Sequence, residues 1–334
     1  TGDSPDSREG IYYIPAASEE ESPTIVGQSH HYETMAFSAF LSENIKFGFL
    51  DLRPGVRFEI FEQERVDRLA GSTYLDKTTA IVLPGVGFIS DIGSISLFGG
   101  FHRGFTPPSS GALKIVNFGE DISDGGLDLK SEKSWNKEIG VRGGLSIIEF
   151  EFSGFHVSIE DMVAAGRGTA FKNLGKVNTM GLETRTALAF SQINKFLPNV
   201  DISYSFLNTE VIDGRIISNV SGSVGSEVDI SGKELPYAPA HTLMVGFTSN
   251  FNERFSLRID TKYVSEVFTD FENIKKTDNL GISGPVPEYS IINLSTSFQF
   301  NERIRLFLSG KNITDESYIG SRLHSNPGQK EAGL

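Results

Sequence analysis

The sequence predicts an all-β protein whose antiparallel strands follow one another as an up-and-down transmembrane β-barrel. Three observations lead to this fold class. Apolar and polar side chains alternate over long stretches, short polar turns and long loops come alternately, and several stretches exceed ten residues. Alternation places the apolar side chains on one face of a strand and the polar ones on the other. About ten residues are what a tilted strand needs to cross a bilayer.

About twelve strands are expected, and each is an alternating stretch that ends at Asn, Asp, Gly or Ser. Their approximate ranges are 31–43, 46–67, 79–89, 94–105, 131–144, 147–162, 174–193, 199–212, 239–250, 254–268, 291–300 and 303–311. Successive strands form hairpins, because every second connection is short and carries turn-forming residues. The short turns are Ser42-Glu43-Asn44, Ser90-Asp91-Ile92-Gly93, Gly143-Gly144, Asn194 to Pro198, Asn252-Glu253 and Asn301-Glu302.

The strand expected at 254–268 shows the two faces clearly. Its apolar set is Phe255, Leu257, Ile259 and Tyr263, and its polar set is Ser256, Arg258, Asp260 and Lys262. Aromatic residues also gather at both strand ends: Phe47, Phe49, Phe88, Phe196, Phe251, Phe255 and Phe300 near the short turns, and Tyr204, Phe206, Tyr263 and Phe268 toward the loops. Two such bands are typical of the two membrane interfaces. We therefore expect the apolar face to contact lipid and the polar face to line the lumen.

The remaining connections are long, at about 68–78, 106–130, 163–173, 213–238, 269–286 and from 314 onward. Because they alternate with the short turns, all of them lie on one side of the sheet. Loops of this length are uncommon in compact domains unless they are functional. Short turns on one side and long loops on the other are typical of outer-membrane barrels.

Composition excludes several other classes of protein. The net charge of −13 argues against a nucleic-acid partner, which requires basic patches. The absence of cysteine excludes a disulfide scaffold and thiolate metal sites. No apolar run approaches the roughly 18 residues of a membrane-spanning helix. The first residues, TGDSPDSREG, carry no signal-peptide pattern.

Several strings match one family in order along the chain. They are PGVRFEI (54–60), LFGGFHRGFTPP (97–108), SEKSWNKEIGV (131–141), NTMGLETRT (178–186), LPYAPAH (235–241) and LFLSGKNITDESY (306–318). They resemble conserved strings of the TonB-dependent outer-membrane receptors, and within these the chain looks most like receptors for ferric citrate and related iron chelates.

The resemblance implies a receptor in the outer membrane of a Gram-negative cell, acting as a monomer. Its partners would be outer-membrane lipid, a ferric chelate and the TonB energy-coupling complex, which engages a plug segment. The full barrel would have about 22 strands around a plugged lumen. We therefore expect residues 1–30 to form an extracellular loop region and residues 31–334 to be the C-terminal portion of the barrel, without the plug and the last strand.

A negatively charged chelate favours cationic side chains on the loop side, since Arg and Lys bind carboxylates. The predicted ligand-binding residues are Arg103, Arg167, Lys172, Arg215, Lys275, Lys276, Arg322 and His324. No catalytic residues, resident metal or cofactor are predicted, because no GxSxG, HExxH or P-loop pattern occurs.

Weaker candidates and other functions remain open at this point. His30-His31 and Glu160-Asp161 are adjacent pairs that alternation places on opposite faces, and the acidic segment 119–128 lacks the EF-hand spacing for calcium. The alternative functions are a passive porin or adhesin barrel, a soluble β-sandwich binding module and a barrel lipase. The lipase is disfavoured because no Ser/His/acid set is evident.

Overall fold

The computed structural model describes residues 30–67, 72–108, 129–164, 172–218, 223, 225–252, 254–278, 281 and 283–322, and every structural statement below concerns these residues. They form sixteen strands and one short 3-10 helix. The strands are β1 (His30–Ser42), β2 (Ile45–Phe47), β3 (Leu50–Asp67), β4 (Ser72–Ile92), β5 (Ile95–Thr106), β6 (Glu132–Leu145), β7 (Ile148–Glu160), β8 (Val163–Ala164), β9 (Lys172–Asn173), β10 (Gly175–Leu188), β11 (Asn199–Ile217), β12 (Glu227–Asp229), β13 (His241–Asn252), β14 (Phe255–Val264), β15 (Tyr289–Asn301) and β16 (Ile304–Gly310).

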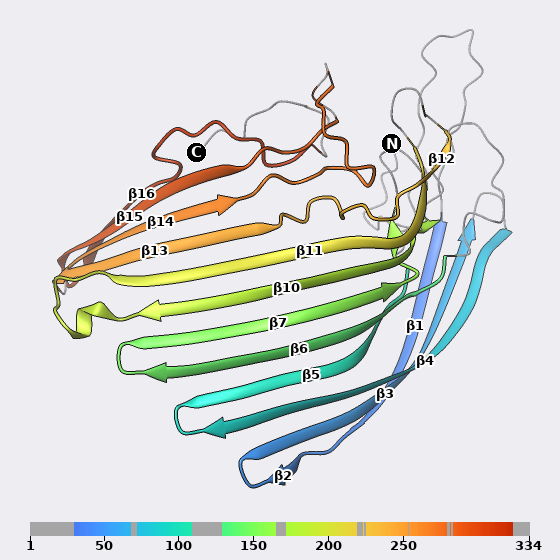
Figure 1. Ribbon diagram of the computed structural model, residues 1–334, viewed down its shortest axis with the longest axis horizontal. Coiled ribbons are helices and arrows are strands. Elements are labelled where there is room, and N and C mark those ends of the chain that lie inside the picture. The colour runs from blue at the N-terminus through green and yellow to red at the C-terminus, as the bar shows by residue number, and fades with distance from the viewer. Residues whose placement is uncertain are drawn as a thin grey trace.

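Twelve long strands make one continuous antiparallel sheet in the order β1-β3-β4-β5-β6-β7-β10-β11-β13-β14-β15-β16 (Figure 1). The short strands β2 and β12 add to β3 and β11, and β8 pairs with β9 apart from the main sheet. Each long strand pairs with the next one along the chain, so the up-and-down order is confirmed. The soluble β-sandwich is not what forms, since a sandwich needs two stacked sheets.

The two ends of the sheet differ as predicted, with tight turns at one end and long connections at the other (Figure 1). Tight turns need backbone conformations with positive φ, and Gly93 (φ 64°) and Ser146 (φ 54°) provide them in two hairpins. The second of these turns corrects the prediction. β6 continues through Gly143-Gly144 to Leu145, and the chain turns at Ser146-Ile147.

Several strand bounds also differ from the sequence prediction. β4 begins at Ser72 and β11 continues to Ile217, because their polar ends still pair with neighbouring strands. β10 ends at Leu188, and the 3-10 helix η3 (Phe190–Gln192) follows after Ala189. β14 ends at Val264, so Phe268 lies beyond the strand. Polar composition at a strand end therefore does not mark a loop in this protein.

Residues directly opposite one another on paired strands share a face of the sheet. Arg142, Glu151 and Arg185 form one such row, and Ile139, Gly154 and Leu182 form another. The two rows lie on opposite faces because Arg142 and Ile139 are an odd number of residues apart. Polar and apolar sets thus separate by face, as predicted.

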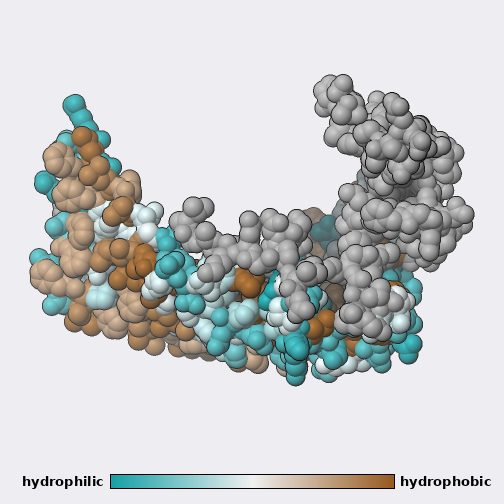
Figure 2. All heavy atoms as spheres, turned by 90° about the horizontal axis from the view of Figure 1, so that it is seen from above, coloured by the Kyte–Doolittle hydropathy of each residue, from teal (hydrophilic) through white to brown (hydrophobic). Residues whose placement is uncertain are grey.

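The sheet is curved like a trough, and its polar face is the concave one. Ile81 on this face is 7% exposed, whereas its neighbour Val82 on the other face is 49% exposed. Such crowding is expected inside a curve. Figure 2 shows the hollow of this curve and, on the rounded side, a broad apolar area over the half that carries the short turns. The described part is therefore an incomplete, open barrel wall with a polar concave face and an apolar convex face.

A dense apolar core exists at the loop end of the sheet. There the cluster comprises Ala164, Leu174, Val177, Val211, Ile216, Ile230 and Phe271. Along the convex face, by contrast, large apolar side chains remain open, with Leu182 57% and Phe37 63% exposed. Contiguous apolar surface of this kind marks a face that contacts another molecule or a lipid environment. No helix in the described ranges is long and apolar enough to cross a bilayer.

Candidate functional site on the concave face and its rim

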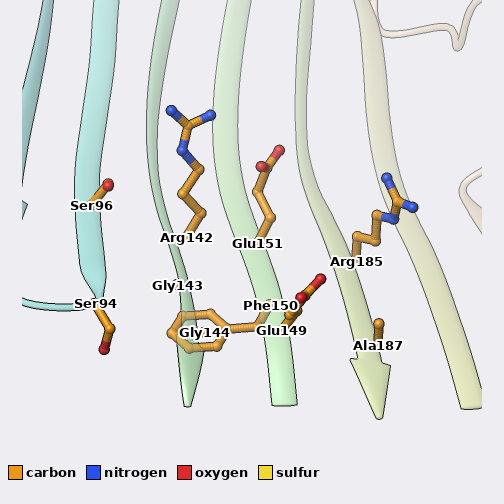
Figure 3. A pocket seen from close by; sticks show the side chains of 10 residues that line it. All are labelled: Ser94, Ser96, Arg142, Gly143, Gly144, Glu149, Phe150, Glu151, Arg185 and Ala187. Carbon is orange, nitrogen blue, oxygen red and sulfur yellow. The ribbon is translucent and has the colours of Figure 1, made fainter. Parts of the chain in front are cut away.

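The concave face carries a row of opposite charges near its short-turn end. Arg142 on β6, Glu151 on β7 and Arg185 on β10 lie directly opposite one another in the register. Figure 3 shows the side chains of the two arginines on either side of the Glu151 carboxylate. With Ser96 and Glu149, these residues line a hollow of about 470 Å³.

A second hollow of about 500 Å³ adjoins the first, and Arg185 lines both. At its centre the Arg258 Nε donates to Asp260 Oδ1 at 2.8 Å, and Arg258 Nη1 lies 3.3 Å from Asp201 Oδ2. Arg258 Nη1 also donates to Thr248 Oγ1 at 3.0 Å. Three strands are therefore linked through one guanidinium. Gly246 leaves room for it, because a Cβ there would lie 2.6 Å from Arg258 Nη2.

The arginines in the two hollows differ in whether they form ion pairs with carboxylates. Arg258 is held by two carboxylates. Arg142 lies over the Phe98 ring at 5.5 Å, and no carboxylate of the described ranges forms an ion pair within 4.0 Å of Arg142 or Arg185. These two guanidiniums can therefore bind acidic groups presented to the concave face from inside the curve. We call the charged residues of the two hollows the charged wall; they are Arg142, Glu151, Arg185, Asp201, Arg258 and Asp260.

At the loop end, the structure brings together two of the predicted ligand-binding residues. Lys172 Nζ lies 3.3 Å from Glu227 Oε1, and Arg215 Nη1 lies 3.7 Å from Glu227 Oε2. Two cations thus share one carboxylate. Asp229 lies directly opposite Arg215 on the neighbouring strand. Hydrogen bonds from Ser231 lower the pKa of Asp229 below the usual 3.8, and Arg215 makes a smaller contribution. We call Lys172, Arg215 and Glu227 the rim cluster.

The other predicted residues fall into different environments. Lys275 and Lys276 are exposed in the connection between β14 and β15. Arg322 is 5% exposed, and its guanidinium donates to the carbonyl oxygens of Gly281 (2.6 Å) and Pro285 (3.1 and 3.2 Å). These contacts make Arg322 part of the framework that holds the loop. Arg167 and His324 lie outside the described residues.

Arg103 lies at the loop end of β5, as predicted, but on the convex face. It is directly opposite Trp135, and its guanidinium carbon lies 5.7 Å from the centre of the Trp135 ring. Its neighbours His102 and Gly104 occupy the concave face instead. Arg103 therefore points away from the hollow, toward the surroundings of the sheet.

The weaker candidates from the sequence do not converge. His31 Nε2 lies 3.6 Å from Glu33 Oε2, and Glu160 is followed at once by Asp161 in a left-handed conformation (φ 56°). Within the described ranges, no three His, Asp or Glu side chains are arranged to hold a metal ion. The acidic segment 119–128 lies outside the described residues.

A family model described as "TonB dependent receptor-like, beta-barrel" matches residues 3–313. The chain belongs to the TonB-dependent receptors.

Solved structures agree with this family on the fold. The ferric citrate transporter FecA, unliganded, matches with a TM-score of 0.75 and 20% identity over 95% of this chain and 46% of its own. The siderophore receptor PiuA from Acinetobacter baumannii matches with a TM-score of 0.68 and 17% identity, over 86% of this chain and 40% of its own. The copper transporter OprC matches with a TM-score of 0.67 and 14% identity, over 91% of this chain and 45% of its own. This chain spans less than half the length of each of these proteins.

The sequence prediction missed two cations of the concave face that form no ion pair within the described residues. Arg142 and Arg185 were not among the predicted residues, although alternation places both with the polar set of their strands. The signal was present, since Arg142 and Glu151 each fall at a polar position of a well-alternating strand. The predicted ligand-binding set contains only cations on the loop side.

Proposed function

We propose that this chain is the C-terminal barrel portion of an outer-membrane receptor that takes up a scarce anionic solute, a ferric siderophore or ferric citrate-like chelate. The observation that carries the proposal is the separation of the two faces. Open apolar rows on the convex face suit acyl chains, and the charged wall suits a polar interior. Family membership supports the same conclusion. Among the described residues, β1 and β16 each pair along one edge only, and further strands would pair with their other edges to complete the barrel.

The capture step would occur at the loop end. Lys172 and Arg215 share the carboxylate of Glu227, and Asp229 lies directly opposite Arg215, so the cations of the rim cluster are held beside two carboxylates. Lys275 and Lys276 add two exposed cations at the same end of the sheet. A chelate with carboxylate or catecholate oxygens would be attracted there, and loops placed on a rigid sheet commonly carry binding function. Arg167 and His324 stay in the proposed contact set on their sequence position alone.

The charged wall would act in a later step of uptake, after capture of the solute at the loop end. It lies below the rim, where the resemblance places a plug that moves when the TonB energy-coupling complex acts. Arg142 and Arg185 would bind acidic groups of that plug. Because exposed ion pairs are worth only about 0–1 kcal/mol each, such contacts hold a domain in place and still release it.

The test is uptake of radiolabelled ferric chelates, ferric citrate among them, by a strain that lacks the gene and by the same strain carrying the full gene. We expect uptake only with the gene, and only when the energy-coupling protein is present. Equal uptake with and without the gene, across iron and other solutes, would contradict the proposal. Uptake that persists without energy coupling would indicate a passive porin.

A double substitution tests the capture step. Lys275→Ala with Lys276→Ala should raise the apparent KM for uptake about fivefold, as expected for removal of exposed charges worth about 1 kcal/mol in total. Lys195→Ala is the matched control, because this lysine lies in the turn region at the opposite end of the sheet. An unchanged KM in the double variant would remove these lysines from the contact set.

A further inference from the structure

The concave hollow of about 500 Å³ contains two cations that have no carboxylate partner among the described residues. Lys262 on β14 and Arg185 on β10 both line this hollow, and neither forms an ion pair within 4.0 Å in the described part of the chain. Arg258 differs from them, because Asp201 and Asp260 both hold its guanidinium. Three cations and two carboxylates thus line the hollow, so its net charge is +1.

The two cations belong to one row that crosses four strands. Arg185 is directly opposite Ser203, and Ser203 is directly opposite Met244. Met244 in turn is directly opposite Lys262. Directly opposite residues share a face, so all four lie on the concave side. Neighbouring strands are about 4.8 Å apart, which separates the backbones of Arg185 and Lys262 by roughly 14 Å.

Between the two cations the row is uncharged. Ser203 contributes a short hydroxyl side chain, and Met244 is 47% exposed although it lies on the polar face. A thioether side chain adapts to the shape of the apolar part of a bound molecule. The volume of the hollow also falls within the range of about 300–1,000 Å³ that is typical of ligand pockets. The arrangement suits a solute with acidic groups at its ends and a less polar body.

The row runs obliquely across the wall. Lys262 is two residues from Val264, the loop-side end of β14. Arg185 is three residues from Leu188, the short-turn end of β10. The strands of a barrel tilt against its axis, so a row perpendicular to the strands changes its depth along the wall. A solute that moves from the loop end to the short-turn end therefore meets Lys262 first and Arg185 second.

We infer that this hollow is an internal binding site for the anionic solute during its passage, and that its ligand class is a multivalent carboxylate chelate. Lys262 and Arg185 donate to carboxylate oxygens at the two ends of the solute, while Ser203 and Met244 contact its body. We call these four residues the transit site. The inference rests on the proposed function and adds a second site that the solute reaches after capture. Arg185 becomes available to the solute once the plug has moved away.

Uptake kinetics separate this site from capture at the loop end. A strain that lacks the gene receives the full gene or a variant of it, and the initial rate is measured against the concentration of radiolabelled ferric citrate. Binding of the same probe to cells without the energy-coupling protein gives the Kd of capture. Arg185→Gln and Lys262→Gln should each lower the maximal rate about fivefold, as expected for one partly exposed charge, and leave this Kd unchanged.

Charge-conserving variants and a distant arginine provide the controls. Arg185→Lys and Lys262→Arg keep the positive charge and should restore most of the maximal rate. Arg303→Gln, in the exposed turn between β15 and β16, should change neither the rate nor the Kd. If Arg185 served only to hold the plug, Arg185→Gln would leave the rate unchanged or raise it, because the plug would then move more easily.

Thiol labelling measures the charge of the transit site without relying on ferric citrate, because this chain has no cysteine. Ser203→Cys is introduced into the full-length receptor, and any cysteine outside residues 1–334 is replaced by serine. Energised cells are treated with an anionic or a cationic thiosulfonate reagent of similar size, and each rate is divided by the rate with a free thiol. The anionic reagent should react about fivefold faster on this scale, and Arg185→Gln should remove the preference. Excess ferric citrate should slow the labelling.

Unchanged maximal rates in Arg185→Gln and Lys262→Gln overturn the inference, and so does equal labelling by the two reagents. An equal loss of rate in Arg185→Gln and Arg185→Lys also overturns it, because the shape of the side chain rather than its charge would then matter. Failure of the proposed function is recognised separately, since the unsubstituted receptor would then take up no ferric citrate. In that case the labelling preference alone decides whether the hollow attracts anions.

Discussion

Ile259→Arg tests the assignment of the two faces more directly than any other single substitution. Ile259 lies in the middle of β14, on the convex face, with Phe247 and Leu294 directly opposite. It is 37% exposed and Phe247 is 42% exposed, so both contribute to the apolar surface of the sheet. If this surface contacts acyl chains, an arginine here places a charge near the bilayer midplane.

The expected cost follows from that depth. Arginine on the lipid face of a barrel destabilises it by about 2–4 kcal/mol at the midplane and by about 0–1 kcal/mol near the interfaces. β14 has ten residues, and Ile259 is the fifth, so the midplane value applies. The equilibrium constant for unfolding should therefore rise roughly 30-fold to nearly 1,000-fold.

Met244→Arg is the matched control. It also exchanges a partly exposed apolar residue for arginine on an adjacent strand, but Met244 lies on the concave face, opposite Ser203 and Lys262. Asp201 and Asp260 line the same hollow and offset the added charge in part. The expected loss is about 1 kcal/mol or less, as for other partly exposed charges.

The assay is reversible unfolding of the full-length receptor from phospholipid vesicles by urea, with the midpoint and the slope fitted for each variant. Ile259→Arg should shift the midpoint strongly, and Met244→Arg should shift it little. Equal shifts, or a larger shift for Met244→Arg, would refute the reasoning, because the convex face would then not be the one that contacts lipid.

Three further predictions concern polar contacts. Arg258→Ala should lower the free energy of unfolding by about 1 kcal/mol, and less in high salt; Asp260→Asn should recover part of the loss in the same urea titration. Arg322→Lys should speed amide exchange at Ser283, Gly284 and Val286, because an ammonium cannot match three guanidinium contacts; unchanged exchange would contradict this. Ser231→Ala should raise the pKa of Asp229 toward 3.8, measured by carboxyl titration in NMR.

The pH dependence of the Asp229 contact has a defined sign. The pKa of the folded protein lies below the ordinary 3.8, so the stabilising contact is fully present above that pH. It is lost as the pH falls through the lowered folded pKa. In Ser231→Ala the loss should begin at a higher pH, and an identical titration in both proteins would contradict the proposed cause.

The strands were predictable because alternation of apolar and polar residues can be read from neighbouring positions, and each strand of the sheet follows it along its length. All twelve long strands and their pairing order are confirmed. The errors lie where local composition and pairing disagree. The polar residues at 72–78 were predicted as loop, yet β4 starts at Ser72 because its ladder with β3 continues. Gly143-Gly144 was predicted as a turn, yet both residues pair with β7.

The candidate site was less predictable, since a cation's role depends on contacts that its sequence position does not reveal. Arg322 is buried because a connection far along the chain offers its carbonyl oxygens at Gly281 and Pro285. No local pattern shows that contact. Arg103 is different, because the order Phe101, Arg103, Phe105 already places it with an apolar set. Its face could have been assigned from alternation alone.

Arg103 and Arg142 show how one physical rule can divide the functions of similar side chains in this protein. Both are cations on neighbouring strands, and both lie against an aromatic ring, at 5.7 and 5.5 Å. They differ in parity, since Trp135 opposite Arg103 lies an odd number of residues from Arg142 on the same strand. One guanidinium consequently lies on the convex face and the other faces the hollow. A shift of one residue in the β5–β6 register would place both guanidiniums on the same face, so the charged wall depends on correct pairing of these strands.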